Sequence, residues 1–342
     1  MYKRQVLYAN AALCRLTGYG CEELAVQTLT ALTHPDDREA AAVARRAVFE
    51  GSVPTSVEKA RLVRPDGRTV CVSISCSVTH GDDDPPCQLV VQMVDVTEQQ
   101  RMERDLTRSN SELSRFAYLA AHELKSPLQA LSGFAALLDR VHGPQLEPQA
   151  REFVRWIVDG AARMNLLIED LLAYCSVDRA EVMLAAVALE AVLADALGQL
   201  ESEIASRGAS VTADALPVVT GDPAQLGQLL QNLLANAVKY VPDGRSPRIH
   251  VSAERASEGW TVTVADNGIG VEDAARDRIF TMFERLHPRE HYKGTGIGLS
   301  ICKRIVERRG GTIWVEPDPA GGSRFRFNLP DVLSVGSALP AA

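Results

Sequence analysis

Two long amphipathic patterns between residues 98 and 178 limit most strongly what this chain can fold into. The first pattern repeats mostly every three, four or seven residues, at Leu106, Leu113, Ala117, Ala120, Leu124, Leu128, Leu131, Ala135 and Leu138. The second contains Phe153, Ile157, Met164, Ile168, Leu171 and Cys175. Such apolar seams are typical of helix bundles. The intervening HGPQLEP has the glycine and prolines of a connection, so residues 98–180 are predicted to form a linker and an antiparallel helical hairpin. Two such helices bury their seams poorly, and we therefore expect a homodimer with a four-helix bundle.

His122 lies on the opposite face of the first predicted helix. At ~100° per residue it projects away from Ala120 and Leu124, among side chains that are nearly all polar. Pro127 removes one hydrogen bond of the helix and its ring clashes with the carbonyl of Glu123, so we expect the helix to bend or loosen beside His122. This pattern indicates an accessible histidine on a helix that can flex.

Three segments further along the chain have the chemistry of a nucleotide site. In QLGQLLQNLLANAVKY, the side chains of Asn232, Asn236 and Lys239 share one helix face, where an asparagine oxygen suits Mg²⁺ and the lysine suits phosphate. The strand GWTVTVAD ends at Asp266, whose carboxylate can accept a hydrogen bond from the amino group of adenine. Glycines follow that strand and also precede a later helix, where backbone amides can bind an anion; they are Gly268, Gly270, Gly294, Gly296 and Gly298. Together these segments predict an ATP–Mg²⁺ site.

The remaining regions differ in pattern. Residues 1–97 contain short strands on either side of the turn RPDGR and a helical stretch, which predicts an α+β domain with helices on one face of a sheet. Residues 187–332 mix strands and helices and hold the glycine clusters. The tail, residues 333–342, has no such pattern and is expected to be disordered.

Composition excludes several classes of protein. The formal charge of −8 argues against a nucleic-acid binder. Because the chain has no apolar run of ~18 residues and no signal peptide, we expect a cytoplasmic protein without a membrane span. The seven cysteines are scattered, without a CxxC pair, so we expect reduced and mostly buried thiols rather than disulfides or a zinc site.

The order of these motifs resembles the sensor histidine kinases of two-component signalling. HELKSPL looks like the phosphoacceptor box, NLLANAVKY like the N box, and DNGIG, IFTMFERL and GTGIGLSICKRIV like the two glycine boxes and the phenylalanine box between them. GGSRFRFNLP looks like the closing hairpin of the GHKL ATP-binding fold, an α/β sandwich. VLYANAALCRLTGY, HPDD and VDVTEQQ resemble a PAS sensor domain. Only five residues precede VLYAN, so either the domain lacks its first edge strand or the start of the gene is misplaced. The resemblance implies a multidomain chain with a PAS domain (1–97), the hairpin (98–180) and the ATP-binding domain (187–332).

The resemblance also implies roles for residues. His122 would take the γ-phosphoryl group of ATP, with Glu123 accepting the other ring proton, and would pass it to an aspartate of a response regulator. Tyr240, Phe283, Thr295 and Leu299 would join the residues above in binding ATP, and Asn236 would bind Mg²⁺. Ser126 occupies the position that serves phosphatase activity in this family, where a serine predicts weak activity. Nothing identifies a PAS ligand.

Two other functions are compatible with parts of the sequence. A non-phosphorylating GHKL ATPase would share the nucleotide motifs, but Asn232 stands where a glutamate would activate water. A pseudokinase that only dimerises and holds partners would not need intact nucleotide motifs.

Overall fold

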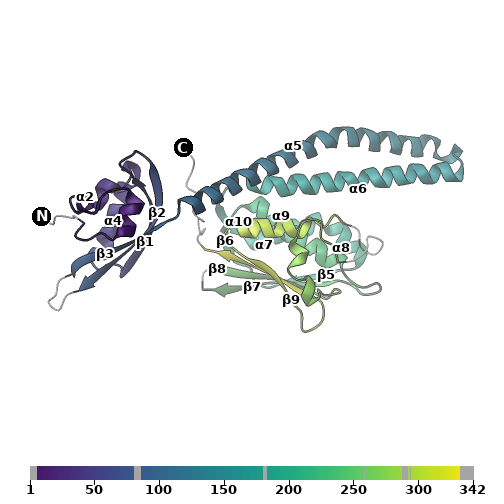
Figure 1. Cartoon of the computed structure of the whole chain (residues 1–342). Coiled ribbons are helices and arrows are strands. Elements are labelled where there is room, and N and C mark those ends of the chain that lie inside the picture. Colours follow the sequence, from purple (N-terminus) through teal and green to yellow (C-terminus); the bar gives the residue numbers. More distant parts are fainter. Residues whose placement is uncertain are drawn as a thin grey trace. The chain divides into compact units, whose positions relative to one another are not determined.

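A computed structural model describes residues 6–80, 86–179, 183–257, 259–286, 292 and 294–331, so the predicted disordered tail lies outside the described residues. The chain divides into two compact units, Met1–Glu112 and Leu113–Ala342 (Figure 1). The long helix α5, Thr97–His142, begins in the first unit and continues in the second. In the part of the chain that is described, no helix is long and apolar enough to cross a membrane.

The first unit is built on an antiparallel sheet in the order β1-β2-β3, formed by Thr55–Val63, Thr69–His80 and Pro86–Asp95. Leu62 pairs with Val70 across the RPDGR turn, where Gly67 has a φ of 79°. Buried residues alternate along β1 and β2, as expected for a sheet with one covered face. Helix α4, Arg38–Phe49, contacts β1 and β2. The predicted α+β architecture is therefore confirmed.

Short helices complete this unit: α1 (Ala11–Thr17), α2 (Cys21–Ala25), α3 (Leu29–Leu32) and the 3₁₀ turn η1 (Pro35–Asp37). Asn10 caps α1 by accepting a hydrogen bond from the Leu13 amide at 2.9 Å. Leu24 and Leu32 are buried in the same apolar cluster as the inner face of the sheet.

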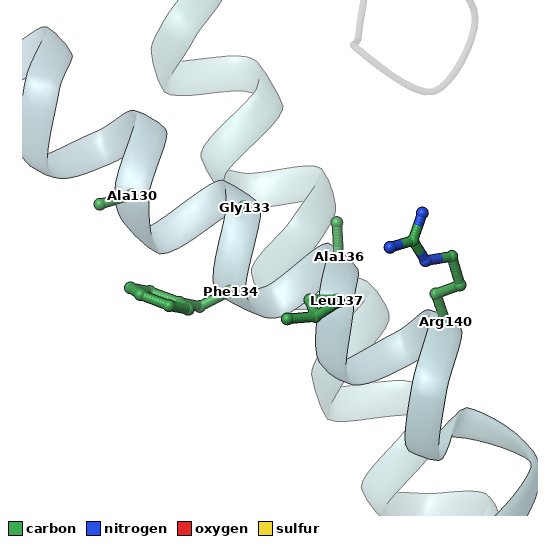
Figure 2. Close-up of a pocket in the computed structure, with 6 residues that line it drawn as sticks. All are labelled: Ala130, Gly133, Phe134, Ala136, Leu137 and Arg140. Atoms are coloured by element: carbon green, nitrogen blue, oxygen red, sulfur yellow. The ribbon is translucent and has the colours of Figure 1, made fainter.

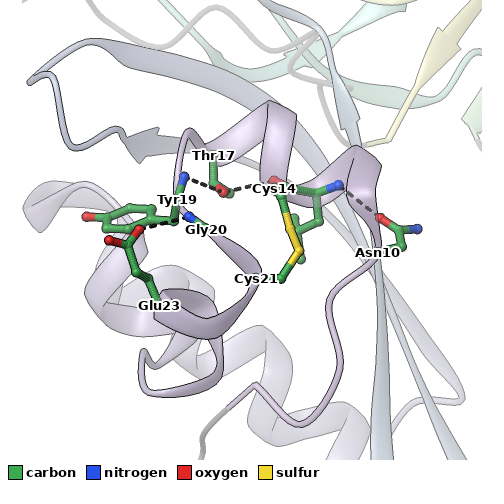
Figure 3. Close-up of a disulfide and its surroundings, with 8 residues drawn as sticks. Asn10, Cys14, Thr17, Tyr19, Gly20, Cys21 and Glu23 are labelled. Atoms are coloured by element: carbon green, nitrogen blue, oxygen red, sulfur yellow. Dashed lines mark hydrogen bonds between the residues drawn. A yellow bond between two sulfur atoms is a disulfide. The ribbon is translucent and has the colours of Figure 1, made fainter.

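A disulfide joins α1 to α2, so the expectation of reduced thiols is wrong for two cysteines. Cys14 and Cys21 have Cα atoms 5.8 Å apart, within the usual span of a disulfide (Figure 3). The turn between them closes tightly because Gly18, at φ 78°, donates its amide hydrogen bond back to the Cys14 carbonyl. A scattered and odd number of cysteines hides such a local pair. Of the other described cysteines, Cys76, Cys175 and Cys302 are buried and Cys71 is half-buried, and none of these four forms a disulfide.

The second unit begins with the predicted hairpin, formed by α5 and α6 (Pro148–Arg179) and joined by the 3₁₀ turn η2, Gly143–Gln145. Helix α5 continues through Pro127 as one helix. From residue 121 onward, the less exposed residues of α5 recur at heptad-like spacing, at Ala121, Lys125, Leu128, Ser132, Ala135 and Asp139. The predicted seam is therefore split, since Leu128 and Ala135 are partly covered while Leu124, Leu131 and Leu138 stay exposed.

The rest of the second unit, which we call the catalytic layer, is residues 183–331. Its main sheet has the order β5-β7-β8-β10-β9. The strands are β5 (Ser210–Ala213), β7 (Arg248–Ala256), β8 (Gly259–Asp266), β9 (Ile313–Pro317) and β10 (Ser323–Pro330). Among the strand pairs of the described residues, β5 and β7 are the one parallel pair. A two-stranded sheet pairs β4 (Ala185–Ala188) with β6 (Val218–Gly221).

Helices cover the main sheet and enclose a large apolar core. They are α7 (Leu189–Gln199), α8 (Glu201–Arg207), α9 (Pro223–Lys239) and α10 (Gly298–Arg308), with the 3₁₀ turns η3 (Asp273–Ala275) and η4 (Arg278–Phe280). Helix α9 contacts β7 and β8, and α10 contacts β9 and β10. Every second residue of β10 is buried, which directs Phe325, Phe327 and Leu329 into this core. This α/β sandwich is the predicted architecture.

Candidate functional site

A cleft of about 230 Å³ opens beside α9, on the face that turns away from the core. The buried stripe of α9 includes Leu226, Leu229 and Leu233, so Asn232, Asn236 and Lys239 face the cleft as predicted. Asn232 is engaged within the protein, because its amide donates to the Gly298 carbonyl at 3.4 Å.

The asparagine one turn later is better placed for a cation. The side chain of Asn236 makes no hydrogen bond to any of the described residues, so its carbonyl oxygen is available to a hard ion such as Mg²⁺. Within the described ranges, no group of three or more His, Cys, Asp and Glu could hold a metal ion. A cation at Asn236 would therefore depend on ligands from a bound nucleotide and water.

The end of β8 supplies a carboxylate to the cleft. Asp266 Oδ1 accepts hydrogen bonds from the amides of Gly268 at 2.8 Å and Ser323 at 3.2 Å. Both bonds end on Oδ1, and none of the described residues donates to Oδ2, which can accept a hydrogen bond from a ligand. Burial raises the pKa of Asp266 to about 6, and the two amide bonds partly oppose that rise.

Gly268 holds this strand end against α9. A Cβ atom at this position would lie 2.3 Å from the Tyr240 carbonyl oxygen, and the amide of Ile269 donates to the same oxygen at 3.0 Å. No side chain fits there without displacing one of the two backbones. The glycine therefore permits the close approach on which the shape of the cleft depends.

The glycine segment, residues 294–298, forms another wall. Gly296 has a φ of 81°, and a Cβ on Gly294 would lie 2.5 Å from the Lys239 ammonium. Lys239 also donates to the Tyr240 hydroxyl at 3.1 Å. The predicted phosphate end, with a lysine beside flexible backbone amides, is thus assembled in one place.

Arg285, which was not predicted from the sequence, holds the first residue of the glycine segment and a residue just before it. Its guanidinium donates to the carbonyls of Gly294 at 2.7 Å and Tyr292 at 2.6 Å. Phe283, at φ 64°, donates its amide to the Gly296 carbonyl at 3.0 Å. The Phe283 side chain is not among those lining the cleft, and Gly268 is also absent from the lining. Their predicted roles in ATP binding stay predictions.

A second residue missed by the sequence analysis comes from the hairpin. Asp170 of α6 lines the cleft and accepts a hydrogen bond from the Thr295 hydroxyl. Tyr240, Gly270, Gly298 and Leu299 were predicted and line the same cleft. The only local signal for Asp170 is a carboxylate next to the apolar seam.

His122 is accessible on α5, with a side chain that is 67% exposed. Its Nδ1 atom lies 3.7 Å from Glu123 Oε1, which is close but longer than a hydrogen bond. Ser126, one turn later, is also exposed. The predicted roles of these three residues stay predictions.

Comparison with known families assigns each region. The family described as "Histidine kinase-, DNA gyrase B-, and HSP90-like ATPase" matches residues 221–333. "His Kinase A (phospho-acceptor) domain" matches residues 112–179, and "PAS fold" matches residues 6–92. The three matches follow one another in the order that the sequence motifs predict.

Individual relatives agree with this assignment. Adaptive-response sensory kinase SasA from Synechococcus sp. (strain JA-3-3Ab) is 32% identical over 283 residues, which cover 78% of this chain and 73% of that protein. Cyanobacterial phytochrome A from Nostoc sp. (strain PCC 7120) is 44% identical over 230 residues, or 67% of this chain. The match spans only 30% of that phytochrome. Full-length ShkA in complex with AMPPNP has a similar structure, with a TM-score of 0.51 and 26% identity, over 64% of this chain and 46% of ShkA.

The fold and the site together define a PAS domain, a phosphoacceptor hairpin and a GHKL-type ATPase domain in one chain. The chain belongs to the sensor histidine kinase family.

Proposed function

We propose that the cleft binds ATP with Mg²⁺ and that His122 receives the γ-phosphoryl group. The observation that carries this proposal is the distribution of groups in the cleft. Asp266, whose Oδ2 accepts no hydrogen bond from the described residues, suits the amino group of adenine, whereas Lys239 and the glycine segment suit phosphates. The complex of ShkA with AMPPNP, a similar structure, supports a nucleotide as the ligand.

Phosphoryl transfer depends mainly on positioning and on neutralisation of charge. Asn236 would hold Mg²⁺ together with the phosphates, and the ion when bound would neutralise phosphate charge. Lys239 and the amides of the glycine segment would orient the triphosphate. His122 would attack the γ-phosphorus through Nε2 as the neutral imidazole. The bond from this phosphorus to the bridging oxygen would break and release ADP, and Glu123 beside Nδ1 would receive the proton of that nitrogen. The phosphohistidine would then supply an aspartate on a response regulator, under control of the PAS domain.

The test uses the full chain with labelled ATP and Mg²⁺. We expect phosphate that is labile in acid and stable in alkali on the wild type. His122→Gln should lose all of this label and keep its affinity for ATP, because the histidine lies on a different element from the cleft. Ser126→Ala, one turn away, is the matched control and should still be labelled. Substantial label on His122→Gln would reject the assignment.

A hydrolase without phosphohistidine is the second candidate. It would release labelled phosphate and leave the protein unlabelled. Asn232 occupies the position expected to activate water, and its amide is used in a hydrogen bond to Gly298, which favours transfer to histidine over hydrolysis.

The hairpin supports a homodimer. Figure 2 shows Phe134 and Leu137 on a groove along α5, which is also lined by Ala130, Gly133, Ala136 and Arg140. Phe134, Leu131 and Leu138 are exposed in the single chain. Helix α6 adds Phe153, Trp156 and Ile157, which are exposed as well. A second copy that covers these faces would complete a four-helix bundle.

A further inference from the structure

The C-terminal half of α6 is attached to the catalytic layer. Val177 is buried in the core of that layer, and Leu167, Ala173 and Tyr174 pack against the same core. The guanidinium carbon of Arg304 on α10 lies 4.2 Å from the centre of the Tyr174 ring, within the range of a cation–π interaction. The helix that ends the phosphoacceptor hairpin is thus held against the helix that follows the glycine segment.

Asp170 projects from this part of α6 into the cleft. It lines the cleft together with Asn236, Lys239 and Thr295, and it accepts the hydrogen bond of the Thr295 hydroxyl. Burial raises the pKa of Asp170, while Thr295 and the charge of Lys239 act in the opposite direction. A carboxylate of the hairpin therefore accepts a hydrogen bond from the Thr295 hydroxyl at the end of the cleft that we assign to phosphates.

The Asp170 carboxylate and a bound triphosphate are both anions. A triphosphate that approaches Lys239 and Thr295 meets the negative charge of Asp170 and competes with it for the same hydroxyl. Like charges in a partly desolvated site repel one another more strongly than in water. Binding of a triphosphate and docking of Asp170 are therefore opposed.

We propose that Asp170 is an internal competitor for the phosphate groups of the nucleotide, and that occupation of the cleft loosens the contact of α6 with α10. This inference rests on the proposed function of the cleft. Because the coupling of two binding events is reciprocal, a docked α6 lowers the affinity for ATP, and bound ATP weakens the docking of α6. The state of the cleft is thereby transmitted to the hairpin that carries His122.

The first experiment measures the affinity of the full chain for nucleotides by calorimetry. Asp170→Asn removes the charge and keeps an oxygen that can accept from Thr295, while Asp170→Ala removes both. We expect both variants to bind ATP more tightly, by about tenfold. The gain should be smaller for ADP and absent for adenosine, which carries no phosphate.

Glu169→Gln is the matched control. Glu169 precedes Asp170 on the same helix, is mostly exposed, pairs with Lys125 at 3.6 Å and does not line the cleft. Its substitution should leave the affinity for ATP unchanged. An equal gain in Glu169→Gln would assign the effect to the general charge of α6 and overturn the role of Asp170.

The other outcomes are equally decisive. Unchanged affinity in both Asp170 variants refutes competition, and weaker binding of ATP would make Asp170 a ligand of the Mg²⁺–nucleotide complex instead. If the wild type binds neither ATP nor ADP, the proposed function of the cleft fails.

A second experiment needs no variant. Hydrogen exchange of residues 167–177 in the wild type should accelerate when ATP is added, and should respond less to adenosine. Exchange that stays constant or slows at saturating ATP would refute the loosening of α6.

Discussion

The catalytic layer and the helical hairpin differ in how firmly surrounding residues hold their functional side chains. In the catalytic layer, a large apolar core fixes α9 and β8, and backbone amides hold the Asp266 carboxylate before any ligand is bound. In the hairpin, His122 projects into solvent and leucines such as Leu131 stay exposed. One region is organised by its own residues, whereas the other offers surfaces that further molecules must complete.

This difference explains why affinity and chemistry can be separated in one chain. A rigid cleft lowers the ordering entropy that a nucleotide must overcome on binding. An exposed histidine must be reachable first by a nucleotide and then, by our proposal, by a regulator. Each of the following experiments tests whether the two regions differ in this way.

The largest expected effect is loss of the dimer. Leu131 and Leu138 are 48% and 42% exposed and lie one heptad apart on α5. Replacing both by glutamate should convert the full chain from dimer to monomer at micromolar concentration, because two charges would be buried in the apolar interface. Sedimentation measures the change. A wild type that is already monomeric would contradict the proposed bundle.

The free energy of unfolding should differ sharply between a matched pair of leucines. Leu233 is 0% exposed in the catalytic layer and Leu124 is 57% exposed on α5. Leu233→Ala should lower the stability of the catalytic layer by about 2–5 kcal/mol. Leu124→Ala should change it by less than about 0.5 kcal/mol. Urea unfolding followed by the fluorescence of Trp260 and Trp314 reports on this layer, and equal effects would remove the contrast between the regions.

The disulfide extends the comparison to the PAS unit. Loss of the Cys14–Cys21 bond frees a short loop in the unfolded chain, which should lower the stability of this unit by about 2–3 kcal/mol in the chain-entropy model. Hydrogen exchange of β2, with and without a reducing agent, measures the change. Cys14→Ser should be insensitive to the reducing agent, whereas Cys71→Ser should keep the response. If hydrogen exchange of β2 in the wild type is the same with and without the reducing agent, the disulfide does not stabilise this unit.

The smallest effect concerns pH. Because the pKa of Asp266 is about 6, the carboxyl is neutral below that pH and accepts a weaker hydrogen bond from adenine. We expect the affinity for ATP to fall by at most about tenfold per pH unit below 6. Asp266→Asn should lack this transition. Because ATP itself titrates in the same way with both proteins, the difference between their pH profiles reports on Asp266. The same pH profile in both proteins would exclude Asp266 as the titrating group.

The contribution of Asp266 to the free energy of unfolding should change with pH in the direction opposite to the affinity for ATP. The folded chain keeps a proton on Asp266 between the ordinary pKa of 3.8 and about 6, whereas the unfolded chain has lost it. The contribution of this group to the free energy of unfolding therefore decreases as pH rises through that window.

Local patterns in the sequence predicted most of the fold and the part of the site that lies within single elements. The face shared by Asn232, Asn236 and Lys239 follows from helical spacing, and Asp266 follows from its place at the end of a strand. These predictions depend only on residues close together in the chain.

Contacts between distant segments could not be predicted in this way. Asp170 and Thr295 are 125 positions apart, and their hydrogen bond depends on how α6 packs against α10. Arg285 contacts Gly294 because its loop folds back on the glycine segment. The disulfide was missed for a different reason, since counting cysteines cannot detect a tight turn that brings two of them together.

The backbone contact at Gly268 has a consequence for fluctuations in the cleft. Because β8 and α9 meet through main-chain atoms, the backbone spacing between Asp266 and Lys239 does not depend on side chains packed between the two elements. Fluctuations that repack side chains around the cleft therefore leave this backbone spacing unchanged. A nucleotide that contacts both the Asp266 carboxylate and the Lys239 ammonium would therefore span a backbone distance that is set before it binds.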